Sequence, residues 1–309
     1  MGARKKRGLI IVCKSRIDVY PAFLFGFSVL ISEYMINFLH TFNPNPVLIS
    51  FGPIHVYWYG FFIVLGALVA IATALKISSY YGIKKEAIID LAFWLILGGI
   101  IGARVYHVFL ELPYYSKYPL DILKVWQGGL AIHGAIIAGL LIIWFFARKH
   151  NLDFWLLAAI IVPGLALAQA IGRWGNYFNG ELFGKPADLA WGIPIDIMKR
   201  PIEYISSEFF HPTFLYESIG NFLIFLVLIF LHIWVIKKRK FNNFFYFLFF
   251  IFYLILYSIL RFCLEFVRID ETPTLLSLRF PQIASLIIIL LTFALLIYKI
   301  RKDKLKIGL

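Results

Sequence analysis

Apolar runs long enough to span a bilayer recur along the chain, separated by polar segments. A spanning helix needs about 20 consecutive, mostly apolar residues. After residue 56 the pattern predicts seven such helices, at 57–78, 87–109, 130–146, 154–171, 213–235, 244–266 and 283–300. The runs do not alternate between apolar and polar positions, which argues against a membrane barrel. We therefore predict an all-α integral membrane protein with seven transmembrane helices.

The N-terminal segment allows two interpretations. It opens with the basic sequence MGARKKRG, and an apolar run from Val19 to Leu39 follows that contains Pro21 and Glu33. This run is either an extra signal-anchor span, or part of an extension ahead of a true start at Met35. In the second case the seven-helix domain covers residues 35–309, and we expect residues 1–34 to be dispensable.

Composition and charge support the membrane class and set an orientation. The chain is 61% hydrophobic and only 15% charged, and its formal net charge is +13. In a soluble protein this charge would suggest a nucleic-acid partner, but here it follows the connections between helices. Basic excess marks the cytoplasmic side of a membrane protein and faces anionic lipid. The basic side consists of alternate connections and the tail: Lys76, Lys84, Lys85, Arg148, Lys149, Lys237, Lys238, Arg239, Lys240, Lys299, Arg301, Lys302, Lys304 and Lys306. The first of the seven spans therefore starts outside, the C-terminus lies inside, and no nucleic acid is implied.

The longest connection, residues 172–211, lies on the opposite side between the fourth and fifth spans. Connections of this length usually carry function. We predict that it forms a small extracytoplasmic cap.

Ionisable residues within the spans gather at the outer ends of their helices. An ionisable group inside a membrane is expensive, so it is a candidate for function. Each residue also has a structural explanation: a snorkelling arginine, a histidine bonded to a neighbouring helix, or an ion pair. Because one carboxylate does not neutralise two guanidinium groups, pairing alone does not explain the stripe Arg261, Glu265 and Arg268, spaced i, i+4, i+7. The full set predicts a polar chamber near the outer leaflet: Arg104, His133, Arg173, Glu181, Glu217, Arg261, Glu265 and Arg268.

This arrangement narrows the function classes. Transporter sites lie near the midplane, and channels need a lined pore through the whole bilayer. The sequence also has no metal-ligand spacing, nucleotide loop or serine elbow. It favours a membrane enzyme or binder for an anionic lipid headgroup, with His133 as candidate base and the arginines as phosphate ligands. A lipid or headgroup transporter and a structural membrane subunit are the alternatives.

The segment QAIGRWGNYFNGELFGKP, residues 169–186, resembles the signature of the prolipoprotein diacylglyceryl transferases, Gly-Arg-x-Gly-Asn-Phe-x-Asn-x-Glu-x-x-Gly. The matching residues are Gly172, Arg173, Gly175, Asn176, Asn179, Glu181 and Gly184, with Tyr177 in place of phenylalanine. WYGF at 58–61, GGIIGAR at 98–104, VWQGGLAIHG at 125–134, HPTFLYE at 211–217 and RFCLEFVR at 261–268 extend the resemblance over about residues 35–300. The family's His-Gly-Gly is His133-Gly134-Ala135 here, a one-methyl change that we expect to be tolerated.

The resemblance implies a specific reaction. Such enzymes move the diacylglyceryl group of phosphatidylglycerol to the lipobox cysteine of a preprolipoprotein, form a thioether and release glycerol phosphate. They work in the bacterial inner membrane, toward its outer leaflet, with no cofactor and no metal. It also implies that His133 helps to deprotonate the thiol and that Arg173 and Arg261 handle the phosphate. The remaining candidate residues would orient the headgroup or shape the site: Tyr59, Arg104, Asn176, Asn179, Glu181, Gly184, Glu217 and Glu265.

Overall fold

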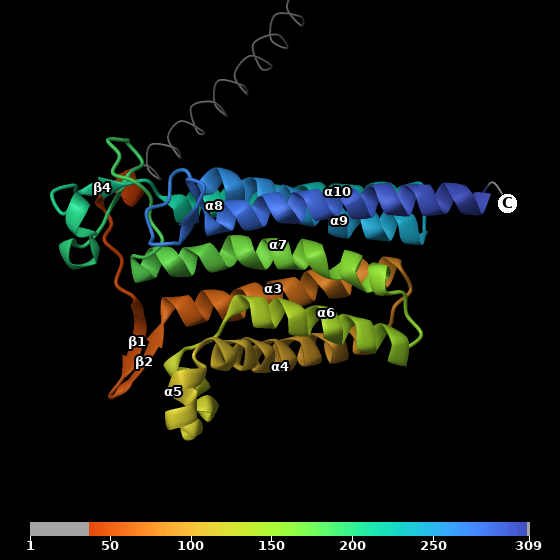
Figure 1. The fold of residues 1–309 in the computed structure, drawn as a ribbon, viewed down its shortest axis with the longest axis horizontal. Coiled ribbons are helices and arrows are strands. Elements are labelled where there is room, and N and C mark those ends of the chain that lie inside the picture. Colours follow the sequence, from red (N-terminus) through yellow and green to blue (C-terminus); the bar gives the residue numbers. More distant parts are fainter. Residues whose placement is uncertain (1–36, 308–309) are drawn as a thin grey trace, which may run out of the picture.

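Seven long helices form the body of the protein and run side by side along its longest axis (Figure 1). The computed structural model describes residues 37–307. Within that range, seven helices are long and apolar enough to cross a membrane, as the sequence predicts. They are α3 (Trp58–Tyr80), α4 (Lys85–Leu110), α6 (Ile132–Lys149), α7 (Phe154–Asn179), α8 (Thr213–Lys237), α9 (Asn243–Leu264) and α10 (Phe280–Ile307). The predicted N-terminal extension, or extra span, lies outside the described residues.

Helix α7 occupies the middle of the bundle. It packs against α3, α8 and α9, while α4 and α6 form a pair on one flank and α10 packs on α9 on the other (Figure 1). Half of the most apolar part of α7 is buried within the protein, a larger share than in any of the other six spans. A functional group carried by α7 is therefore held by neighbours on several sides.

Close approach of two glycines joins α4 to α6. A Cβ atom added at Gly102 would lie 2.7 Å from the carbonyl oxygen of Gly134, and one at Gly134 would lie 2.1 Å from that of Gly102. Small residues at helix contacts let backbones approach in this way within a membrane. This contact fixes the first turn of α6, where His133 lies.

Helix α7 is longer than predicted. The sequence places its end at residue 171, but the helix continues to Asn179 and ends at Gly180, which has left-handed backbone angles. The last turns of α7 carry polar side chains that form hydrogen bonds within the protein. The apolar run therefore ends before the helix does. The predicted cap, 172–211, therefore starts later, since its first eight residues belong to α7.

An internal proline in α7 is compensated by a neighbouring helix. Pro163 has no N–H, so the carbonyl of Ala159, one turn earlier, lacks its usual helical donor. The Nε2 atom of His232 on α8 lies 3.0 Å from that oxygen, and the hydroxyl of Tyr81 lies 2.7 Å from the Nδ1 atom of the same ring. The histidine therefore replaces the missing donor.

Short elements gather at one end of the bundle, which we call the cap end. The segment 180–212 contains β3 (Ile193–Pro194) paired with β4 (Phe209–Phe210), and the 3-10 turns η3 (Ile197–Lys199) and η4 (Ile202–Tyr204). The other elements at this end are β1 (Val47–Phe51), β2 (Ile54–Tyr57), α5 (Leu112–Lys117), η1 (Pro119–Leu123), η2 (Val125–Gln127), β5 (Thr274–Leu275) and β6 (Leu278–Arg279). The sequence does not predict the three small hairpins, because their strands have five residues or fewer.

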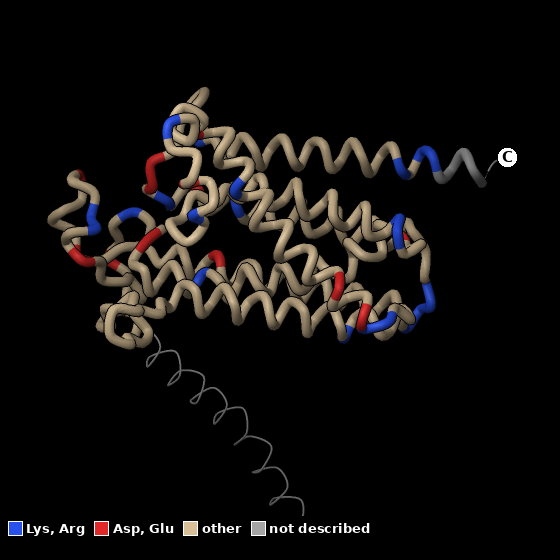
Figure 2. The backbone as a smooth tube through the Cα atoms, turned by 90° about the horizontal axis from the view of Figure 1, so that it is seen from below, with Lys and Arg blue, Asp and Glu red and all other residues tan. Residues whose placement is uncertain are grey.

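Charged residues lie mainly at the two ends of the bundle, with a nearly uncharged stretch between them (Figure 2). The connections α3–α4, α6–α7 and α8–α9 and the end of α10 lie at the end opposite the cap. These are the basic segments on which the predicted cytoplasmic side rests.

Candidate functional site

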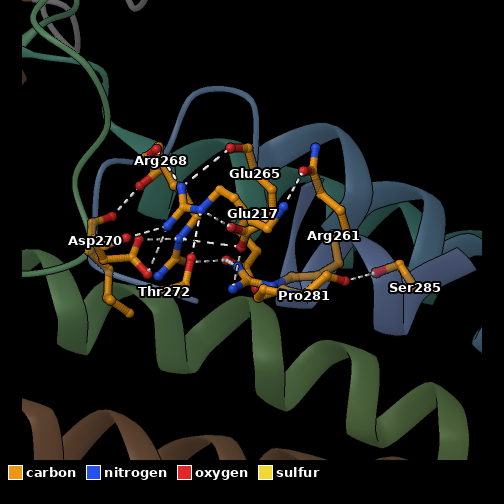
Figure 3. A network of polar contacts seen from close by, with 12 residues as sticks. Glu217, Arg261, Glu265, Arg268, Asp270, Thr272, Pro281 and Ser285 are labelled. Carbon is orange, nitrogen blue, oxygen red and sulfur yellow. Dashed lines mark hydrogen bonds and ion pairs between the residues drawn. The ribbon is translucent and has the colours of Figure 1, made fainter. Parts of the chain in front are cut away.

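A buried carboxylate on α8 is the centre of a polar network at the cap end. Glu217 is 2% exposed and forms an ion pair with Arg173 of α7. Its Oε2 atom lies 3.8 Å from Nη1 of Arg261 and 3.6 Å from Nη1 of Arg268. Figure 3 shows Glu217 close to Arg261 and Arg268. One carboxylate therefore faces three guanidinium groups.

A second buried carboxylate, Glu265, lies on the far side of the same arginines. Its Oε1 atom lies 2.5 Å from Nη2 of Arg261 and 3.8 Å from Nε of Arg268, and its Oε2 atom lies 3.0 Å from Nε of Arg279. The i, i+4 pair of Arg261 and Glu265 forms as the sequence predicts. The predicted stripe does not reach Arg268, because α9 ends at Leu264 and Arg268 pairs instead with Gly184 in a β-bridge.

Asp270 closes the network toward solvent. Its Oδ1 atom lies 2.7 Å from Nε of Arg268, and its Oδ2 atom lies 3.5 Å from Nη2 of Arg279. Burial alone would raise the pKa of this carboxyl, but the hydrogen bond and charge of Arg268, with the charge of Arg279, bring the pKa below its ordinary value. Asp270 is therefore ionised at neutral pH.

The amides of the signature connect this network to the cap. Nη1 of Arg173 donates to Oδ1 of Asn176 at 3.2 Å, and Nδ2 of Asn176 donates to Oε1 of Glu181 at 2.8 Å. Asn179 donates to the same oxygen of Glu181 at 3.4 Å. Glu181 is exposed and contacts the network only through these amides.

Gly184 is required by close packing. A Cβ atom there would lie 2.8 Å from atoms of both His211 and Val267. Its backbone N–H donates to the carbonyl of His211 at 3.0 Å, so the signature segment is fixed between the start of α8 and the end of α9. Gly184 shapes the site through its backbone.

Two donors of the network have no hydrogen-bond partner within the described residues. They are Nε of Arg173 and Nη1 of Arg261, both buried at the atom level. An unsatisfied buried donor is unfavourable by about 1–3 kcal/mol. Their arginine side chains are 23% and 19% exposed, so a ligand can still reach them. The pattern fits an anion that accepts from both arginines.

An apolar groove runs along the helices next to this network. It has a volume of about 400 Å³ and is lined by α3, α4 and α7, from Ala74 and Ile88 to Gln169 and Gly172. Gly172 directly precedes Arg173. One end of the apolar groove therefore lies next to Arg173 of the network.

A second groove, which we call the outer groove, opens on the cap. It has a volume of about 800 Å³ and is bounded by residues 179–183, 198–204 and 269–271. Two acidic residues described above, Glu181 and Asp270, line the outer groove. Met198 and Ile202 also line it, and they are 90% and 89% exposed. The outer groove therefore borders the network at Glu181 and Asp270.

Arg104 lies apart from the network and organises a loop. Its guanidinium donates to the carbonyls of Ile122, Gly128 and Gly129 at 2.9, 2.7 and 3.0 Å, and to that of Asp121. Gly128 and Gly129 have φ angles of 91° and 68°, which only glycine adopts without strain. Arg104 thus holds the segment that leads into α6 and His133.

His133 and Tyr59 are also outside the network of ion pairs. His133 is exposed and its ring centroid lies 5.8 Å from that of Tyr106, without a hydrogen bond in the described part of the chain. Tyr59 packs on the backbone of α7, where a Cβ atom at Gly175 would lie 2.9 Å from its ring. The structure therefore unites Arg173, Asn176, Asn179, Glu181, Glu217, Arg261 and Glu265, and leaves Tyr59, Arg104 and His133 around them.

Two charged members of the network were missed by sequence reasoning. Arg279 and Asp270 lie in the connection between α9 and α10, where charge is expected on the surface. One signal was available, since Arg279 stands directly before the last apolar run, at the depth of the other arginines. Within residues 37–307 there is no group of three or more histidine, cysteine or acidic residues placed to hold a metal ion.

Comparison with known proteins identifies the family. Residues 46–298 match the prolipoprotein diacylglyceryl transferase family. The phosphatidylglycerol–prolipoprotein diacylglyceryl transferase of Synechococcus elongatus is 43% identical over 250 residues, which cover 80% of this chain and 84% of that protein. The enzyme of the same name from Synechocystis sp. is 39% identical over 252 residues, 81% of this chain and 87% of its own. The chain therefore belongs to the prolipoprotein diacylglyceryl transferase family.

Proposed function

We propose that this protein transfers the diacylglyceryl group of phosphatidylglycerol to the lipobox cysteine of preprolipoproteins, the first step of lipoprotein maturation. The observation that carries the proposal is that Nε of Arg173 and Nη1 of Arg261 have no hydrogen-bond partner among the described residues, with Arg173 directly after the end of an apolar groove. A phospholipid has the matching parts: an anionic phosphate and two acyl chains. The names of the bacterial relatives point to the same substrates.

These placements support the following reaction. The cysteine thiolate attacks the glyceryl carbon, a carbon–sulfur bond forms, and the bond from that carbon to the phosphate oxygen breaks. Glycerol phosphate leaves with the electron pair, and its new charge is stabilised by Arg173 and Arg261. His133 is the candidate base for the thiol proton. Asn176 and Asn179 orient the headgroup, and Glu217 and Glu265 hold the arginines in place.

We propose that the cap end faces the outside of the bacterial inner membrane. The basic segments at the opposite end support this orientation, because basic excess marks the cytoplasmic side. The thiol-bearing polypeptide would then approach over the outer groove, which opens on the same side as the network.

The test uses purified protein in phosphatidylglycerol-containing nanodiscs with a peptide that carries a lipobox cysteine. We expect the peptide to gain the mass of one diacylglyceryl group, bound as a thioether that survives mild base. The competing function is a transporter of an anionic phospholipid or its headgroup. Such a transporter would leave both the lipid and the peptide unchanged, which would refute the proposal.

A further inference from the structure

Arg279, the last residue of β6, uses its whole guanidinium group inside the polar network. Its Nε atom lies 3.0 Å from Oε2 of Glu265 and donates to the hydroxyl of Thr272 at 2.8 Å. Its Nη1 atom donates to the carbonyl of Arg268 at 2.5 Å, and its Nη2 atom donates to that of Asp270. Arg279 therefore has no donor group directed at a ligand, and its effect must pass through its neighbours.

The charge balance of the network depends on this residue. The ion-paired network contains four guanidinium groups, from Arg173, Arg261, Arg268 and Arg279, and three carboxylates, from Glu217, Glu265 and Asp270. One positive charge is in surplus. Without Arg279, three arginines would face three acids and no surplus would remain.

Arg173 and Arg261 are the arginines of this network that a ligand can reach most easily. The side chains of Arg268 and Glu265 are 5% and 0% exposed, whereas those of Arg173 and Arg261 are 23% and 19% exposed. Arg268 and Arg279 both pair with Asp270, and Arg279 shares Glu265 with Arg261, each on a different carboxylate oxygen. Arg261 can then keep Nη1 free of a hydrogen bond, as observed. The exposed carboxylate of Glu181 reaches the network only through amides and is screened by solvent.

We propose that Arg279 is a positioning residue that keeps the anion site cationic. It compensates part of the negative charge of Glu265 and Asp270, so that the positive charge of Arg261 and Arg173 is not fully balanced and their free N–H groups can bind the phosphate of a lipid. The inference rests on the proposed function, since it concerns the phosphate at that same site. It adds a fourth arginine, from strand β6 directly before the last helix.

The test compares charge variants in the thioether assay, with separate KM values for phosphatidylglycerol and for the peptide. Arg279→Gln removes the surplus and should raise KM for phosphatidylglycerol roughly ten- to a hundredfold, the range expected for hydrogen bonds to charged groups. Arg279→Lys keeps the charge and should recover part of this loss. In Arg279→Gln combined with Asp270→Asn the surplus returns, and KM should fall back to within about threefold of the natural protein.

A structural role predicts a different result. If Arg279 only fastens the β5–β6 hairpin, the double variant will be no better than Arg279→Gln, and KM for the peptide will rise as well. Unchanged KM for phosphatidylglycerol in Arg279→Gln also overturns the inference. If Arg279→Gln does not fold, the single variant Asp270→Asn tests the inference. It adds one positive charge to the surplus of the network, so KM for phosphatidylglycerol should stay at or below its natural value, and a raised KM would overturn the inference.

Arg148→Gln is the matched control. Arg148 lies in the last turn of α6, at the end of the bundle opposite the cap, and its guanidinium stacks on the ring of Trp144, 4.2 Å from the ring centroid. The same loss of charge there should leave KM for phosphatidylglycerol within about twofold. Natural protein that makes no thioether would refute the proposed function itself, whereas active natural protein with an unaffected Arg279→Gln refutes only this inference.

Discussion

Arg173 on α7 and Glu217 on α8 form an ion pair that is enclosed at the cap end of the bundle. The pair leaves Nε of Arg173 without a partner among the described residues. Glu217 thus fixes the guanidinium while part of it stays free. A group held in this way is prepared to bind a phosphate without reorganising.

Arg173→Lys and Arg261→Lys should each lose most transfer activity while the protein still inserts. Lysine keeps the charge but lacks the planar fork that contacts a carboxylate and a phosphate together. Loss of one such stabilising donor reduces turnover by roughly 10²–10³. The measurement is thioether formation, with insertion checked by purification from membranes. Near-normal turnover in both variants would mean that these arginines are structural ion pairs.

His133→Gln should abolish transfer and leave lipid binding nearly intact. Glutamine keeps hydrogen-bonding capacity but does not take up the thiol proton, and loss of a positioned base costs roughly 10²–10⁴ in rate. Because His133 is exposed and makes no hydrogen bond within residues 37–307, the fold should not suffer. Thioether formation and retention of phosphatidylglycerol are measured on the same preparation. Loss of both would identify His133 as a headgroup contact, and loss of neither would exclude it as the base.

The apolar runs of the sequence predict the seven helices well, because membrane burial demands length and apolarity and little else. The signature predicts Arg173, Asn176 and Glu181, which do lie together. The sequence does not predict that Arg279 joins the network, because its contacts depend on a hairpin that folds back onto the end of α9. Arg104 was placed in the chamber on depth alone. In the structure Arg104 donates to backbone carbonyls of the loop before α6, and residue spacing does not predict such contacts.

Gly102→Ala should destabilise the pairing of α4 and α6. The new methyl group would lie 2.4 Å from Cβ of Ala138 and 2.7 Å from the carbonyl oxygen of Gly134. Overpacking of this kind costs about 1–3 kcal/mol. Gly99→Ala, on the same helix, meets nothing within 4 Å and is the matched control. Thermal unfolding in nanodiscs compares the two, and equal midpoints would contradict the close contact.

Ile202→Asp should raise KM for the peptide and leave KM for phosphatidylglycerol unchanged. Ile202 lines the outer groove and is 89% exposed, so an apolar segment of the peptide would lose contact area there. Leu276→Asp is the control, since Leu276 is equally exposed but lies outside the outer groove. An equal effect of both substitutions would show that the outer groove is not the route of the polypeptide.

Asp270 should make the natural protein lose stability in acid. Its folded pKa lies below its ordinary value of 3.8, so the unfolded chain binds the proton first as pH falls. The stabilisation is present above the unfolded pKa and is lost as pH falls through the lowered folded pKa. Unfolding midpoints of the natural protein and of Asp270→Asn should therefore converge in acid. A difference that stays constant down to about pH 3 would contradict the pairing with Arg268.

The orientation is tested by reporters of location. A reporter fused after Arg239 should read cytoplasmic, and one placed within residues 185–205 should read extracytoplasmic. The physical reason is the basic excess at the end opposite the cap. The reverse result would put the arginine network on the wrong side for a translocated polypeptide.

Glycerol phosphate should leave the arginine network as the thioether forms. The amount of glycerol phosphate released for each thioether made is measured in the natural protein and in Arg173→Lys. We expect one glycerol phosphate per thioether in the natural protein, and a parallel fall of both products in the variant. A peptide that gains lipid with its phosphate still attached, or an undiminished release of glycerol phosphate from Arg173→Lys, would contradict this mechanism.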